Sequence, residues 1–237
     1  MDETTLNVVE LDLNDLNTQE INASIRTTLR HRPNFLLRNA LGQHNIGVGV
    51  TNQSSFVVQG DLGHYAFAMC EGIQVRIEGD VGWGVGENLM SGEIFVNGDA
   101  GSSAGPSLRG GVVAIAGNAG PRAGIGMKGG TLIIGGDAGY MSGFMMQKGT
   151  IIILGNAGPG LGDSMYDGQI FVAGTITELG HDTRINFLNE SEYEAIAHLV
   201  LPYHMSIPLP STFRKVVSAG TLHHFDKKEI ARWKTAL

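Results

Sequence analysis

The sequence predicts an all-β fold, a right-handed parallel β-helix of about seven 19-residue coils with short helical segments at both ends. The glycine that closes each apolar run returns every 19 residues, and 35 of the 237 residues are glycine. A helical repeat would instead place apolar residues every three or four positions and would lose about 1 kcal/mol for each internal glycine. The closing glycines, which we call anchor glycines, are Gly60, Gly79, Gly98, Gly117, Gly136, Gly155 and Gly174.

Apolar columns surround the anchor glycines. Side chains on one face of a strand recur at every second residue, so the positions four and two before each anchor predict the interior face of a short strand. No single coil could bury this face alone, and each strand would therefore stack in parallel on the next. The column at four before is Phe56, Val75, Ile94, Val113, Leu132, Ile151 and Ile170; at two before, Val58, Ile77, Val96, Ile115, Ile134, Ile153 and Val172; at ten after, Cys70, Leu89, Leu108, Met127, Met146 and Met165.

A polar turn follows each anchor glycine. Its first residue is Asp61, Asp80, Asp99, Asn118, Asp137 or Asn156. Asp and Asn tolerate left-handed backbone and bond to nearby backbone groups, and we expect the glycines to supply corners with positive φ. Calcium-binding β-helices use a nine-residue period that is missing here. These residues therefore predict a ladder of turns rather than a metal site.

The chain divides into three parts. Residues 1–34 predict an N-terminal helical segment, residues 35–175 the β-helix, and residues 176–237 a C-terminal helical extension. The helix-forming stretches of that extension are "ESEYEAIAHLVL" (190–201) and "KKEIARWKTAL" (227–237).

The pattern Gly-Asp/Asn-x-Gly-x-x-x-Gly on a 19-residue coil resembles the GXGXG repeat of the glutamate synthase C-terminal domain. The resemblance covers Phe56 to Gly174, about half of the chain. The ending "FRKVVSAGTLHHFD" and the opening "TQEINASIRTTLRH" resemble the stand-alone small subunits of split glutamate-synthase-like complexes, including that of N-methylglutamate synthase.

This resemblance implies a non-catalytic scaffold subunit in a hetero-oligomer. The partners would be an amidotransferase-type subunit and a synthase-type subunit that carries FMN and an iron–sulfur cluster. The alternative within this class is a scaffold like the β-helix subunit of formylmethanofuran dehydrogenase, although those chains usually lack such a tail. From another class, an independent β-helix enzyme would act in an exterior groove. That enzyme would need clustered charges on one face and a secretion signal, and neither is visible.

We expect no catalytic, cofactor-binding or metal-binding residues on this chain. "GIGMKG" (124–129) matches a dinucleotide fingerprint, but the next residues predict a strand where the fingerprint requires a helix. Cys70 falls in an interior column and predicts a small core residue. The histidines are scattered and form no pair at metal-ligand spacing: His31, His44, His64, His181, His198, His204, His223 and His224.

An apolar stripe is expected on the outside of the coils. Three residues before each anchor, side chains should point outward, and in the later coils they are large and apolar. Such a stripe is normally covered, either by the C-terminal helices of the chain or by another subunit. We favour another subunit, which makes the candidate partner interface Phe95, Ile133, Ile152 and Phe171.

Charge and composition limit the possible partners and compartments. The net charge of −7 gives no electrostatic reason to expect nucleic-acid binding. A single cysteine cannot form an internal disulfide, which favours a reducing compartment. The acidic N-terminus lacks the regions of a signal peptide, and the most apolar window (131–154) is broken by charges and glycines. We therefore expect a cytoplasmic protein without a membrane span.

Overall fold

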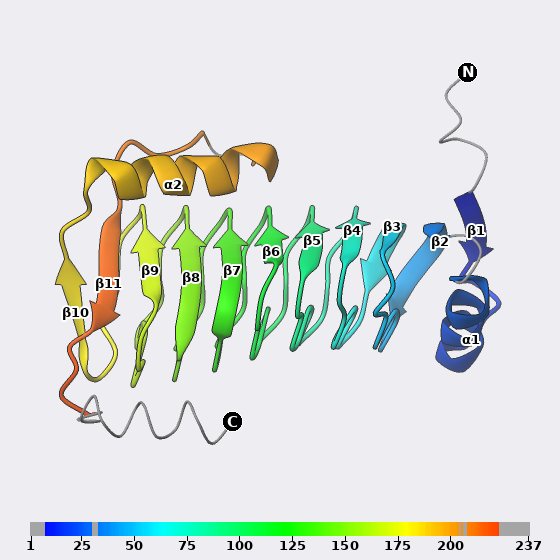
Figure 1. Cartoon of the computed structure of the whole chain (residues 1–237), viewed down its shortest axis with the longest axis horizontal. Coiled ribbons are helices and arrows are strands. Elements are labelled where there is room, and N and C mark those ends of the chain that lie inside the picture. Colours follow the sequence, from blue (N-terminus) through cyan, green and yellow to red (C-terminus); the bar gives the residue numbers. More distant parts are fainter. Residues whose placement is uncertain (1–7, 30–32, 204, 206–207, 223–237) are drawn as a thin grey trace.

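The protein is a parallel β-solenoid. The computed structural model describes residues 8–29, 33–203, 205 and 208–222, and their strands form one sheet in the order β1 to β9, then β11 and β10. Figure 1 shows the strands side by side like rungs, with α1 at one end and α2 lying across the sheet near the other. The strands are β1 (Val8–Asp12), β2 (Asn34–Gln43), β3 (Ser54–Leu62), β4 (Ile73–Ile77), β5 (Gly92–Val96), β6 (Val112–Ile115), β7 (Lys128–Ile134), β8 (Lys148–Ile153), β9 (Gln169–Val172), β10 (Thr183–Asn186) and β11 (Arg214–Ser218), and the helices are α1 (Thr18–Thr28), α2 (Glu190–Val200) and the 3₁₀ turn η2 (Leu201–Tyr203). The fold class predicted from the 19-residue interval is confirmed.

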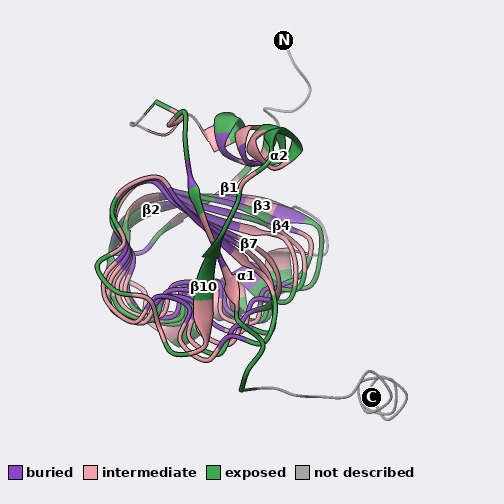
Figure 2. Cartoon of the chain, turned by 90° about the vertical axis from the view of Figure 1, so that its left-hand side faces the viewer, coloured by how far each residue is buried: buried purple, intermediate pink, exposed green. Residues whose placement is uncertain are grey.

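The strands stack in the register that the interval requires. Val75 pairs with Ile94, which is opposite Val113 in the next coil, so partners are separated by 19 residues. All three predicted interior columns are buried. Figure 2 looks along the rod and shows the buried residues gathered on the inner side of the coils, with α2 outside. The hydrophobic core is therefore a continuous column, and each coil depends on its neighbours.

The polar turn residues form a hydrogen-bonded ladder. The amide of Asp80 donates to Asp61 Oδ1 at 2.8 Å, and the amide of Asp99 donates to Asp80 Oδ1 at 2.7 Å. The same bond recurs up to Thr175, whose amide donates to Asn156 Oδ1. Asn156 also donates its side-chain amide to Asp137 Oδ1 at 3.0 Å. The ladder thus satisfies backbone donors of the next coil, 19 residues along the chain, which corrects the expected bonds to nearby backbone groups. None of its Asp and Asn residues has a positive φ.

Two kinds of glycine have different roles in the coils, although the coil of Gly60 has Phe67 at the second position. A Cβ on the anchor Gly79 would lie 2.2 Å from Asp61 Oδ1, so this glycine lets the ladder oxygen approach the next backbone. Of the seven anchors, Gly60 alone has a positive φ, +110°, which corrects the expectation for Gly79 and the five later anchors. Gly86, seven residues after Gly79, has a φ of +65° and supplies the left-handed corner.

Both ends of the rod carry additional elements. Helix α1 begins at a capping box on Asn17 and buries Ile21 and Ile25 over the first coils. The Asn22 side chain fixes it there by donating to the Asn45 carbonyl and accepting from the Gly47 amide, both at 2.8 Å. The segment 1–34 also holds β1, which lies parallel to β2.

The C-terminal extension (176–237) returns to the sheet. Strand β11 pairs antiparallel with β9, and β10 pairs antiparallel with β11. The extension therefore contains two strands as well as α2, which the expectation of a helical segment did not include. The helix predicted at 227–237 lies outside the described residues.

Candidate interaction surface

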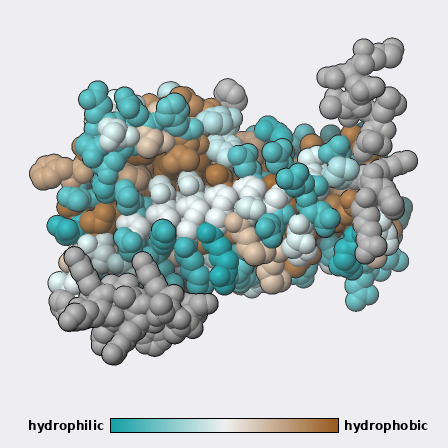
Figure 3. Space-filling view, viewed as in Figure 1, coloured by the Kyte–Doolittle hydropathy of each residue, from teal (hydrophilic) through white to brown (hydrophobic). Residues whose placement is uncertain are grey.

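The outer apolar stripe is covered by the chain itself. Phe95 is 8% exposed, Phe171 is 4% exposed, and Ile133 and Ile152 are fully buried. They share one apolar cluster with residues of the C-terminal extension, namely Ile196, Val200 and Phe213. Figure 3 shows brown apolar atoms beneath the largely teal outer surface of α2. The expectation that another subunit covers these four residues is therefore corrected, because α2 and the segment after it occupy that face.

Polar contacts hold α2 in place. Asn189 caps its first turn, and the Glu192 carboxylate in turn accepts a hydrogen bond from the Asn189 amide. The same Glu192 forms a largely buried ion pair with Lys215 of β11. The Tyr193 hydroxyl donates to the Pro210 carbonyl at 3.1 Å. These contacts orient the apolar side of the helix toward the stripe.

The ion pair predicts an acid-sensitive contribution to stability. The hydrogen bond from Lys215, together with that from the Asn189 amide, holds the pKa of Glu192 below its usual range. Because the folded-state pKa is below the unfolded value of about 4.3, this stabilisation is complete above that value and is lost as the pH falls through the folded-state pKa.

Glu192→Gln keeps a capping acceptor but removes the group that titrates. It should therefore flatten the acid side of the plot of stability against pH. Urea midpoints measured across this pH range should fall less steeply for Glu192→Gln than for wild type. Parallel curves for the two proteins would contradict this role of the ion pair.

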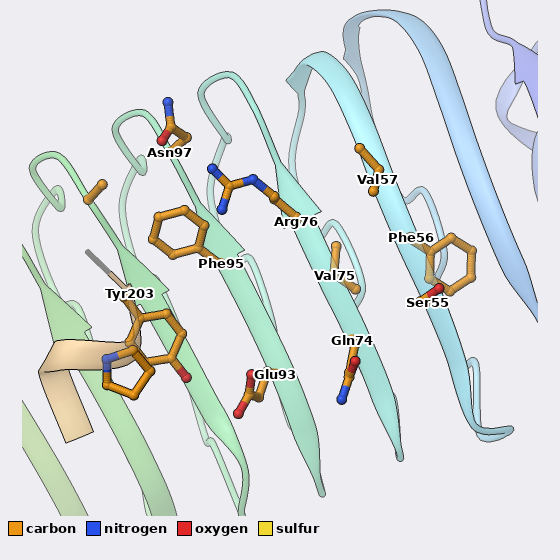
Figure 4. A pocket seen from close by; sticks show the side chains of 12 residues that line it. Ser55, Phe56, Val57, Gln74, Val75, Arg76, Glu93, Phe95, Asn97 and Tyr203 are labelled. Carbon is orange, nitrogen blue, oxygen red and sulfur yellow. The ribbon is translucent and has the colours of Figure 1, made fainter. Parts of the chain in front are cut away.

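A groove opens where α2 ends. It has a volume of about 450 Å³ and lies over the outer faces of β3, β4 and β5. In Figure 4, Arg76 and Asn97 lie at one end and Glu93 and Gln74 at the other. Other lining residues are Ser55, Phe56, Val57, Val75, Phe95, Ala116, Pro202 and Tyr203.

An aromatic pair separates the groove from the covered stripe. The Tyr203 ring stacks on Phe95 with 5.7 Å between centroids, and the Arg76 guanidinium lies 4.8 Å from the Phe95 centroid. Burial, with a smaller effect of Glu93, raises the pKa of Tyr203 to about 12. Its phenol therefore keeps its proton near neutral pH. The groove thus offers a guanidinium, a carboxylate, side-chain amides and an apolar floor. These groups can form hydrogen bonds and apolar contacts with a bound molecule.

The motifs singled out in the sequence have structural roles. Residues 121–126 of the "GIGMKG" region form turns, and β7 follows from Lys128 without a helix. Cys70 is buried, and burial raises its pKa to about 11. Within the described ranges, no three His, Cys, Asp or Glu residues are grouped to hold a metal ion.

Two histidines take part in a stacked column that the sequence pattern did not reveal. His44 and His64 lie ring on ring with 4.4 Å between centroids, and Trp83 stacks on His64 at 5.0 Å. The amides of His64 and Trp83 each donate to the Nδ1 atom of the preceding histidine at 2.9 Å. The column therefore continues the ladder principle at a second corner. The histidines that fall outside the described residues are His31, His204, His223 and His224.

One signal for the groove was present in the sequence. The outward column that carries Phe95 and Ile133 has Arg76 one coil earlier. This change from apolar to charged marks the place where the cover by the chain ends. What covers the later coils could not be read from the column itself.

Comparisons with known proteins give a limited result. No family model matches the sequence. The chain is 35% identical over 60 residues to protein GlxC of Rhizobium meliloti (strain 1021). The matched stretch is 25% of this chain and 26% of GlxC, so it spans about a quarter of the relative. Of the described helices, neither α1 nor α2 has the length and apolar character to span a bilayer. The comparisons thus establish a local similarity to GlxC.

Proposed function

We propose that this chain is a non-catalytic scaffold subunit of a glutamate-synthase-like oxidoreductase complex. The observation that carries the proposal is the unbroken 19-residue coil with its Gly-Asp/Asn ladder, because the resemblance to the GXGXG domain rests on that pattern. The local similarity to GlxC includes about a quarter of the chain.

The construction of the rod supports a scaffold role. Backbone and side-chain hydrogen bonds connect every coil to the next, so the surface of the rod has a fixed geometry. Helix α2 covers the outer face of the later coils and leaves the groove over β3 to β5 open. The groove offers Arg76 and Glu93 at opposite ends of an apolar floor. A segment of another polypeptide fits such a surface, with hydrogen bonds at both ends.

The finer proposal is a complex of the N-methylglutamate synthase type. The chain would pack between an amidotransferase-type subunit and a synthase-type subunit, and the synthase-type subunit would hold the FMN and the iron–sulfur cluster. The ending of the chain carries this choice, because "FRKVVSAGTLHHFD" resembles the ending of the stand-alone small subunits. Within it, Arg214–Ser218 form β11. These residues complete the sheet beside β9.

Capture of the tagged full-length chain from its native source tests the proposal. We expect two further chains, one amidotransferase-like and one flavin-dependent synthase-like, in fixed ratio to the tagged chain. Mass spectrometry identifies the captured chains, and size-exclusion chromatography gives the mass of the assembly. A chain that elutes alone from a gently prepared extract would contradict the scaffold role.

A further inference from the structure

The charge of the rod alternates along its length. Residues 60–100 carry seven acidic side chains and one basic side chain, and residues 151–203 carry the same numbers. Between them, residues 101–150 carry four basic side chains and a single acidic one, Asp137. A chain with a net charge of −7 thus contains a section of net charge +3 between two sections of −6 each.

Three of the four basic residues follow one corner of the solenoid. Lys128 begins β7 and Lys148 begins β8, and their Cα atoms are partners in the sheet. Arg109 lies one coil earlier, where the Lys128 amide donates to the carbonyl of the preceding Leu108 at 2.7 Å. All three residues are exposed. We call Arg109, Lys128 and Lys148 the basic strip.

Glycines after the basic residues allow this close stacking. A Cβ at Gly129 would lie 2.3 Å from the Arg109 carbonyl oxygen, and a Cβ at Gly149 would lie 2.7 Å from the Gly129 oxygen. The backbones therefore meet at the spacing of neighbouring strands, about 4.8 Å. The three basic side chains leave the backbone at successive coils.

Within the part of the chain that the structure describes, no acidic side chain forms an ion pair with the basic strip. Neither lysine has an ion pair there, and Arg109 Nε donates to the neutral Asn88 Oδ1 at 3.4 Å. Like charges at neighbouring sheet positions destabilise a fold. The Asp/Asn ladder shows the contrasting arrangement, because its carboxylates accept backbone amides and Asn interrupts the aspartates at Asn118 and Asn156. An external anion would supply the missing compensation.

The size of the strip selects a compact anionic partner. Two coil steps give a length of about 10 Å, close to the Debye length of about 8 Å at physiological salt. A long polyanion such as a nucleic acid would extend past the strip onto the acidic sections on both sides and be repelled there. A small group of Asp and Glu side chains on a protein would meet only the strip.

We infer that the basic strip docks an acidic patch on a partner subunit. This inference rests on the proposed function, since it assigns a surface to one of the proposed contacts. The acidic sections on both sides repel a patch that is displaced along the rod. Charge complementarity would thus fix the position of the partner as well as favour its encounter.

Charge reversal on the strip tests the inference. Lys128→Glu with Lys148→Glu should fold as wild type by circular dichroism and melting, and should reduce capture of the partner at least about ten-fold. The matched control is Arg26→Glu with Arg184→Glu, which changes the net charge equally at exposed positions outside the strip. This control should retain capture within about two-fold of wild type.

Each outcome decides the question. Equal capture by wild type and the strip variant would overturn the docking surface and leave the proposed function intact. Equal loss in both variants would assign the effect to net charge and would also overturn the inference. Nucleic acid that co-purifies with wild type and is lost from the strip variant would assign the strip to a different partner. Failure of wild type to capture any subunit would overturn both proposals.

Discussion

Ile134→Asp is expected to unfold the solenoid cooperatively. Ile134 is fully buried, and its Cα partners in the neighbouring strands are Ile115 and Ile153. The carboxylate would lie between isoleucines without a partner, which costs several kcal/mol, and the lost apolar burial adds roughly 1.5–3 kcal/mol. The total is comparable to the whole stability of a typical domain, about 5–15 kcal/mol. Because neighbouring coils support each other, the damage should spread along the rod.

Circular dichroism and thermal melting measure this effect. The matched control is Gln147→Asp, which places the same side chain at an exposed position just before the strand of the next coil. The control should melt close to wild type, while Ile134→Asp should lose the β signal or melt far lower. An Ile134→Asp protein with the wild-type melting temperature would show that this column is not interior.

Ile196→Asp should uncover the outer stripe and make the protein aggregate. Ile196 lies on α2 and is 1% exposed among Ile133, Ile152 and Phe171. Each large apolar side chain that returns to water costs roughly 1.5–3 kcal/mol, and the exposed band would run along several coils. The β-sheet signal should persist because the interior columns stay intact.

Light scattering and binding of a hydrophobic dye report the uncovered face. Ala195→Asp introduces the same charge one residue earlier on the exposed side of α2 and should remain monodisperse. If Ile196→Asp is as soluble and as free of dye as Ala195→Asp, the helix is not the cover of the stripe. The substitution therefore separates coverage by the chain itself from coverage by a partner.

Periodicity predicted the interior of the rod because every coil repeats the same short-range pattern. Ile94 and Val113 occupy one column, and a constant interval places them together without further information. The column of Asp and Asn followed in the same way, although neither its hydrogen bonds to the next coil nor the reason for the anchor glycine did. Gly79 is required by the approach of Asp61 Oδ1, a contact between coils that turn propensities do not encode.

The cover of the outer face could not be predicted because it depends on contacts far apart in the sequence. The stripe was visible at Ile133 and Ile152, but the same apolar surface suits an intramolecular helix or another subunit. Strand β11 pairs with β9 through Val216 and Ile170, which are separated by more than forty residues. The sequence "FRKVVS" alternates weakly and gives no indication of its partner strand. Among the residues that line the groove, only Arg76 indicated in the sequence where the cover of the outer face ends.

The absorbance spectrum of the isolated chain, recorded beside that of the captured complex, is the sharpest test of the scaffold role. We predict a colourless chain without iron and a complex that carries flavin and iron–sulfur absorbance. Metal analysis and release of the flavin give the stoichiometry of each. Stoichiometric flavin or iron on the isolated chain would contradict the scaffold role, because a non-catalytic scaffold holds neither.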